Sequence, residues 1–205
     1  MSFVFCDLGG TTRGLMLSEV EADIASGTLN ESKRFSAEGA AAYPDLLREA
    51  VRAGDEDTLR ESLASGPYFV AKEWVNKEPN GYWKSIPSTA AQTFADGEFN
   101  RFFVRGLALE ALSNGAELLE VYRAKWVADP RPESEALIGA CFQPVSLLGD
   151  LRANQGVETA IGLARPNSGL SARIKGFPTP CLDPSVPRSA YRSGCALCMA
   201  GRITS

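Results

Sequence analysis

Histidine is absent from this chain of 205 residues. Its absence excludes Ser-His-Asp triads, Cys-His pairs, histidine-ligated metals and histidine general bases built from this chain alone. Enzyme chemistry, where present, would fall to carboxylates, lysine, tyrosine or cysteine.

Long apolar runs are also missing. No run approaches the roughly 20 residues that cross a bilayer. The first residues lack the basic segment and the apolar stretch of a secretory signal. We therefore expect no membrane partner, and synthesis in the cytoplasm.

Cysteine is sparse, and its five positions are Cys6, Cys141, Cys181, Cys195 and Cys198. An odd number with three near the end is not typical of a secreted disulfide framework, so we expect reduced thiols. Cys195 and Cys198, with Cys181 upstream, are candidate zinc ligands because paired thiolates at this spacing can share a tetrahedral ion. With three local sulfurs and no histidine for the fourth position, buried or unpaired thiols are the favoured interpretation.

The composition is that of a folded protein with a polarised charge. Hydrophobic residues make up 44% and charged residues 22% of the chain, which suffices for one core. Residues 1–66 carry 6 basic and 12 acidic groups, whereas residues 136–205 carry 7 and 3. The tail of one subunit could lie on the acidic face of another, or the basic arm could contact nucleic acid; the alternative is two solvated faces.

Helical periodicity dominates the chain. Apolar residues recur with helical spacing in four segments, 13–25, 43–53, 98–112 and 144–154. Pro44 suits a first helical turn, and Asp55 is placed to cap a further short helix after Gly54. We therefore expect an αα-hairpin in the first third of the chain.

Sheet signals are fewer and lie late in the sequence. We expect a strand over 118–127, a short apolar run at 136–142 and a short strand within 166–174. The predicted fold class is α+β, with a predominantly helical core and a small sheet with hairpins. Residues 1–174 form the predicted single globular domain, and residues 175–205, which are rich in proline, form an extended C-terminal arm.

Residues 66–87 differ in composition from their surroundings, because they are rich in aromatic, lysine and turn residues. Two short extended stretches around Pro79-Asn80-Gly81 predict a hairpin or a projecting loop. The candidate interface residues are Tyr68, Trp74, Tyr82 and Trp83, with Lys72, Lys77 and Lys84 interleaved. Such residues can stack on bases, but a protein contact or a half-buried hairpin is favoured because aromatic residues also anchor interfaces.

Arg101 and Arg105 share one face of the helix predicted over 98–112. They are candidate interface residues for a polar or anionic partner. The favoured alternative is an intrahelical pair with Glu98 and contact with solvent.

Two stretches raise the question of catalysis. Asp7–Gly10, within FCDLGGTTRGLML, resembles the first phosphate loop of the sugar-kinase and actin superfamily, which implies nucleotide binding. A second glycine-rich phosphate loop is missing, and Met16, Val20 and Ile24 continue with helical spacing. The favoured interpretation is a flexible lead-in, with Thr11 or Thr12 capping a helix.

The second stretch is the strand predicted near Glu120. Acidic residues followed by Arg123 and Lys125 are similar to the sheet carboxylates and lysine of restriction-type nucleases, whose metal site they would imply. The Glu-x-Lys spacing of those sites is missing here. We assign no catalytic residue, no cofactor-binding residue and no cofactor.

Four blocks carry a further resemblance, namely residues 97–107, 121–125, 130–139 and 166–174. They resemble proteins that virion structural genes of tailed bacteriophages and prophages encode. The resemblance extends over residues 13–174. The resemblance implies a non-enzymatic, capsid-associated role in decoration or head completion. The implied partners are further copies of the chain and other virion proteins, and the implied location is the assembled virion.

Overall fold

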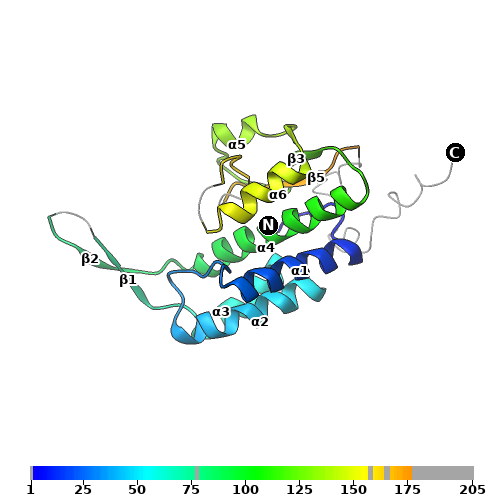
Figure 1. Ribbon diagram of the computed structural model, residues 1–205. Coiled ribbons are helices and arrows are strands. Elements are labelled where there is room, and N and C mark those ends of the chain that lie inside the picture. Colours follow the sequence, from blue (N-terminus) through cyan, green and yellow to red (C-terminus); the bar gives the residue numbers. More distant parts are fainter. Residues whose placement is uncertain (1, 77–78, 157–158, 164–166, 177–205) are drawn as a thin grey trace.

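The computed structural model describes residues 2–76, 79–156, 159–163 and 167–176. Six helices and five short strands lie in this part of the chain (Figure 1). The helices are α1 (Gly10–Ser26), α2 (Ala37–Ala53), α3 (Glu56–Ser65), α4 (Ala90–Ser113), α5 (Pro132–Ala136) and α6 (Pro144–Ala153). The strands are β1 (Lys72–Val75), β2 (Tyr82–Ser85), β3 (Leu119–Arg123), β4 (Cys141–Phe142) and β5 (Leu170–Ile174). The predicted α+β class is confirmed.

The central element is α4, which lies between α1, α2 and α3 on one side and α6 with the β4-β3-β5 sheet on the other (Figure 1). Its 24 residues begin eight positions earlier than the predicted helix. Phe99, Phe102 and Phe103 are at most 1% exposed. Because both sides of α4 are covered, apolar residues occupy most of its circumference rather than a single stripe.

The predicted αα-hairpin is formed by α2 and α3. The Asp55 side chain accepts a hydrogen bond from the Thr58 N–H at 3.0 Å, and the Asp55 N–H donates to the Thr58 hydroxyl at 3.3 Å. These reciprocal bonds form a capping box. Pro44 does not lie in the first turn of this helix, so that prediction is wrong. The alanine-rich stretch before it extends α2 back to Ala37, where Ser36 caps the helix, so Pro44 lies inside it.

The sheet is smaller than the predicted strands. β3 pairs antiparallel with β5, Leu119 opposite Ile174, and with the short β4. Beyond Arg123 the chain leaves the ladder, because the Ala124 and Lys125 N–H groups both donate to the Gly169 carbonyl. Most of the predicted C-terminal arm, residues 177–205, lies outside the described residues.

None of the helices that the structure describes combines the length and apolarity needed to span a membrane.

We expect Gly106→Ala to lower the free energy of unfolding by about 1–3 kcal/mol. A Cβ at Gly106 would lie 2.9 Å from both the Met16 backbone nitrogen and the Thr12 carbonyl oxygen, so α1 would have to move away from α4. Urea unfolding measures the change. The matched control is Gly14→Ala on the exposed side of α1, where no heavy atom lies within 4 Å and where alanine should stabilise the helix. Equal effects of the two substitutions would contradict the close packing of α1 on α4.

Candidate functional site

A two-stranded hairpin, β1 and β2, projects from the helical body (Figure 1). This confirms the hairpin predicted around Pro79-Asn80-Gly81. Its base is anchored where Arg34 donates two hydrogen bonds to Glu73, at 2.8 and 2.9 Å. Beyond this anchor the two strands pair only with each other in the described part of the chain.

The hairpin presents two tryptophans on one face. Trp74 and Trp83 are directly opposite in the register, so their side chains share a face, and their rings meet edge to face with centroids 5.4 Å apart. They are 52% and 64% exposed. Trp74 also covers Gly81, where a Cβ would come within 2.4 Å of its indole ring. Trp83 is therefore an exposed aromatic side chain that is braced in place.

The other face of the hairpin is different. Tyr82 lies there opposite Val75, and Lys84 lies opposite Glu73. Tyr82 is also exposed, but Tyr68 is half-buried at the base of the hairpin, where its carbonyl accepts the Ser36 N–H. Three of the four aromatic candidates thus lie on the projecting part; of the lysines, Lys77 is outside the described residues.

A hairpin of this kind is not expected in isolation. Two strands alone are marginally stable in water, and large exposed aromatic patches mark interaction sites. The exposed tryptophan face therefore makes the hairpin a candidate contact surface.

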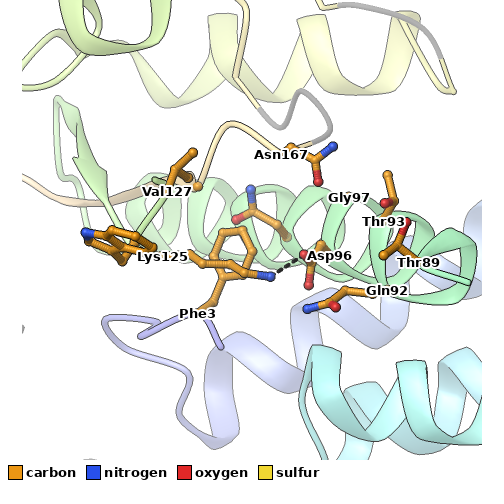
Figure 2. Close-up of a pocket in the computed structure, with 12 residues that line it drawn as sticks. Phe3, Thr89, Gln92, Thr93, Asp96, Gly97, Lys125, Val127 and Asn167 are labelled. Atoms are coloured by element: carbon orange, nitrogen blue, oxygen red, sulfur yellow. Dashed lines mark hydrogen bonds and ion pairs between the residues drawn. The ribbon is translucent and has the colours of Figure 1, made fainter. Parts of the chain in front are cut away.

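A cleft of about 300 Å³ lies along the first half of α4 (Figure 2). Its lining includes Thr89, four residues after the hairpin ends at Ser85. Its floor is a polar stripe on α4, in which Thr93, Asp96, Gly97 and Asn100 follow helical spacing. Its other walls come from distant parts of the chain, namely Phe3, residues 125–127, Asn167 and Gly169.

One buried ion pair crosses the cleft. Figure 2 shows Lys125 extended to Asp96, with which it forms a hydrogen-bonded ion pair. Burial raises the pKa of Asp96, and the contact with Lys125 opposes that rise. This pair leaves the floor of the cleft without net charge.

Several polar side chains of the cleft are uncommitted. Within the described part of the chain, the side chains of Gln92, Thr93 and Asn167 take part in no hydrogen bond. Gly97 adds room, because a Cβ built there meets no heavy atom within 4 Å. The cleft therefore offers neutral donors and acceptors to a ligand side chain.

The N-terminal segment forms one wall of the cleft and is tied to α3. The Phe3 N–H donates to Glu56 at 2.6 Å, and the Val4 N–H donates to the Ala124 carbonyl at 2.8 Å. Burial raises the pKa of Glu56 to about 7, although the hydrogen bond from Phe3 acts in the opposite direction.

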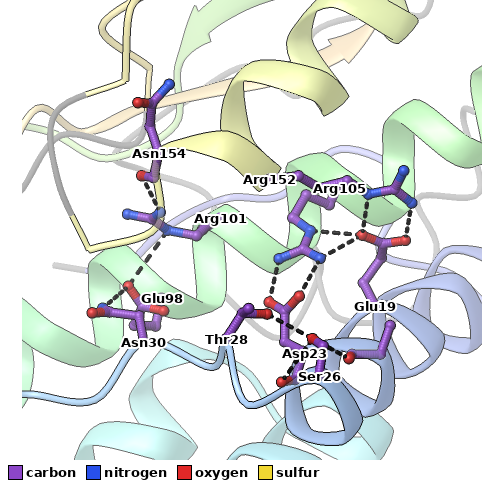
Figure 3. A network of polar contacts seen from close by, with 11 residues as sticks. Glu19, Asp23, Ser26, Thr28, Asn30, Glu98, Arg101, Arg105, Arg152 and Asn154 are labelled. Atoms are coloured by element: carbon purple, nitrogen blue, oxygen red, sulfur yellow. Dashed lines mark hydrogen bonds and ion pairs between the residues drawn. The ribbon is translucent and has the colours of Figure 1, made fainter.

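Arg105 is not available to a partner, which corrects its prediction as an interface residue. It is 1% exposed and lies against α1, where it donates to Glu19 at 2.7 Å and to both oxygens of Asp23 at 2.5 and 2.9 Å (Figure 3). Arg152 completes the network from α6 by donating to Glu19. Burial acts to raise the pKa of Glu19, but Arg152 and Arg105 outweigh it and hold that pKa below its usual value.

Arg101 is likewise buried, at 4% exposure. Its predicted ion pair with Glu98 is confirmed, at 3.5 Å. The predicted contact with solvent is wrong, because the loop after α6 covers Arg101, whose guanidinium donates a hydrogen bond to the Asn154 carbonyl at 2.7 Å (Figure 3). Burial raises the pKa of Glu98, opposed by Arg101 and by the Asn30 amide.

The opening motif does not form a strand-turn-strand loop. The chain passes through Asp7 at φ 63° and enters α1 at Gly10, with Gly9 as the N-cap. The interpretation as a helix lead-in is confirmed, but the predicted threonine cap is wrong. The Thr12 hydroxyl lies inside the first turn, where it donates back to the Asp7 carbonyl at 2.5 Å and pairs with Glu110.

Glu120 and the cysteines are the remaining candidates for catalysis or metal binding. Glu120 is ion-paired with Arg173 at 3.0 Å, across the β3–β5 ladder. Among the described residues, no group of three or more cysteine, aspartate or glutamate side chains is arranged to hold a metal ion. Cys181, Cys195 and Cys198 lie outside the described residues.

Comparison with family models, with curated proteins and with solved structures finds no match for this chain.

Replacing Arg105 by methionine should lower the free energy of unfolding by about 3–5 kcal/mol, because it leaves the buried Asp23 without its counter-charge and Glu19 with Arg152 alone. Arg52→Met, on the exposed side of α2, is the control and should change stability by less than about 0.5 kcal/mol. Chemical denaturation of the two variants decides. A small loss for Arg105→Met would show that this network does not hold α1 to α4.

Glu56 should make stability depend on pH. Its pKa rises from about 4.5 when unfolded to about 7 when folded, so its stabilising contribution is complete below pH 4.5 and is lost as pH rises through 7. The loss amounts to roughly 3 kcal/mol at 1.36 kcal/mol per pKa unit. Glu56→Gln removes this dependence, so the variant should gain stability relative to the parent between pH 5 and pH 8 in paired unfolding experiments. A difference that stays constant with pH would refute the raised pKa.

Proposed function

We propose that this protein is a non-enzymatic structural component of a tailed-bacteriophage particle, acting through contacts between subunits. It would be made in the host cytoplasm and become part of the virion. The sequence blocks similar to virion structural proteins motivate the kind of particle, and the hairpin supplies the contact.

The observation that carries the proposal is the exposed tryptophan face of the hairpin. Trp83 and Trp74 are the residue type most enriched among the anchors of protein interfaces. Their mutual edge-to-face contact restrains both rings, which reduces the entropy lost on binding. A projecting, preorganised aromatic surface serves a subunit contact and has no evident use in a solitary enzyme.

The disposition of charge supports the same conclusion. Glu19, Asp23 and Arg105 are paired with one another inside the protein, and Glu120 is paired with Arg173. A carboxylate held by a guanidinium in this way is a poor general base, because the guanidinium N–H groups occupy its lone pairs. Glu120, on which the nuclease alternative depends, is held in this way, and the Asp7–Gly10 loop leads into α1 and not into a second strand, so both enzyme alternatives lose support.

A nucleic-acid-binding module is the second candidate, favoured by two exposed lysines of the hairpin, Lys72 on the tryptophan face and Lys84 on the opposite face. Aromatic and cationic side chains on one ribbon can stack on bases and contact phosphates. Binding of this kind weakens steeply with salt.

The test is electron microscopy of the protein isolated under mild conditions from the cells that encode it, with antibody labelling of the chain. We expect label on defined phage particles or their head precursors, and loss of label when Trp74 and Trp83 are both replaced by serine in the encoding genome. Tyr82→Ser, on the opposite face of the hairpin, is the control and should keep the label. A chain that stays unassembled in every fraction would overturn the proposal, and a salt-sensitive complex with DNA or RNA would favour the second candidate.

A further inference from the structure

We propose that two copies of this chain associate reciprocally, with Trp83 of each copy seated in the cleft on α4 of the other. This inference rests on the proposed function in using the hairpin as a subunit contact, and it names the partner as a second copy of the chain.

The chemistry of Trp83 and of the cleft is complementary. An indole has a large apolar ring and a single N–H donor. The cleft has the Phe3 ring and the apolar stem of Lys125 on one wall, and the amide groups of Gln92 and Asn167 have no partner within the described residues. The ring would pack on the apolar wall while the indole N–H donates to one of the two amide oxygens.

The positions of the two features along the chain favour reciprocal contact. Trp83 lies near the turn of the hairpin, and the cleft begins at Thr89, just beyond its base. A two-fold axis that passes beside the hairpin, level with the midpoint between these points, would bring each Trp83 to the other copy's cleft. A two-fold contact of this kind uses the same surface on both subunits and closes on itself.

The exposed area of the two tryptophans sets an upper limit to this contact, and that limit reaches the size of a small stable interface. The exposed parts of Trp74 and Trp83 amount to on the order of 300 Å² per copy, taking up to about 250 Å² for a tryptophan. Two copies and the surfaces they cover then bury about 1,200 Å², which is the lower end of stable interfaces.

Charge does not oppose the association, although each chain carries a net charge of −4. At the hairpin, Glu73 is paired with Arg34, and in the cleft Asp96 is paired with Lys125. Lys72, on the same face as the tryptophans, forms no ion pair among the described residues, but its positive charge approaches a copy whose net charge is negative. The overall repulsion between the two copies acts over longer distances, where salt screens it.

Sedimentation velocity of the full chain tests the inference. The wild type should sediment as a dimer of twice the 22.0 kDa monomer mass. Trp83→Ala removes the inserted side chain, and Gly97→Leu fills the cleft without a clash at Cβ. Each should raise the dimer dissociation constant at least about 30-fold. Gly97→Ala is a milder second variant should the leucine disturb folding, which circular dichroism checks.

Two matched controls separate this contact from general surface effects. Tyr82→Ala changes an exposed aromatic residue on the opposite face of the same strand, and Gly149→Leu changes an exposed helical glycine on α6 that has equal room. Both variants should remain dimeric.

Mixing the two monomeric variants is the decisive step. A heterodimer of Trp83→Ala with Gly97→Leu keeps one intact tryptophan facing one intact cleft, so dimer should reappear in the mixture with an affinity between those of wild type and either variant. A wild type that is monomeric at all concentrations, or variants that dimerise like wild type, would overturn the inference. So would a mixture that stays monomeric.

Failure here is distinguishable from failure of the proposed function. A monomeric chain whose double tryptophan variant is lost from phage particles would refute the dimer and leave the structural role standing. A reciprocal dimer that is never found on a particle would do the reverse.

Discussion

The architecture depends on one buried ion-pair network between α1 and α4. Glu19 and Asp23 lie one turn apart on α1 and face the interior, where two unpaired carboxylates would be prohibitively costly. Arg105 lies between them and reaches both. The neighbouring Gly106 lets the backbones approach closely enough for this contact. Together they fix where α4 crosses α1, and α4 in turn carries the floor of the cleft and begins five residues after the hairpin ends.

Much of the fold could be predicted from periodicity, but element ends could not. The capping box at Asp55 is a local signal, because its donor and acceptor lie three residues apart, and it was identifiable from the sequence. The early start of α4 is not local. Residues 90–97 show little apolar stripe because a polar stripe there faces the cleft, so the helical pattern emerges in the sequence only after Glu98. The early start of α2 was missed for a similar reason, since its alanines carry helix propensity but little periodicity.

The two parts of the candidate site, the hairpin and the cleft, differ in how well the sequence predicts them. The exposed aromatic residues of the hairpin cluster within a dozen positions, so composition alone indicates them. The cleft is built from Phe3, α4, Lys125 and Asn167, and only tertiary structure brings these together. The spacing of Thr93, Asp96, Gly97 and Asn100 on one helical face was the one signal that could have indicated it. Arg101 and Arg105 were misassigned because helical spacing shows which residues share a face and not whether that face is covered.

A division of labour between charged and neutral polar groups follows from this packing. The guanidinium groups of Arg101 and Arg105 are used inside the chain, where they compensate buried carboxylates and hold helices in register. The contact features left at the surface are largely neutral, namely the indole of Trp83 and the amides of Gln92 and Asn167, with Lys72 as a charge on the tryptophan face. Surfaces that meet their own copies benefit from such neutrality, because any unpaired charge on one copy faces the same charge on the next near a two-fold axis. Specificity must then come from shape, through a braced ring and a cleft that a single added side chain at Gly97 would fill.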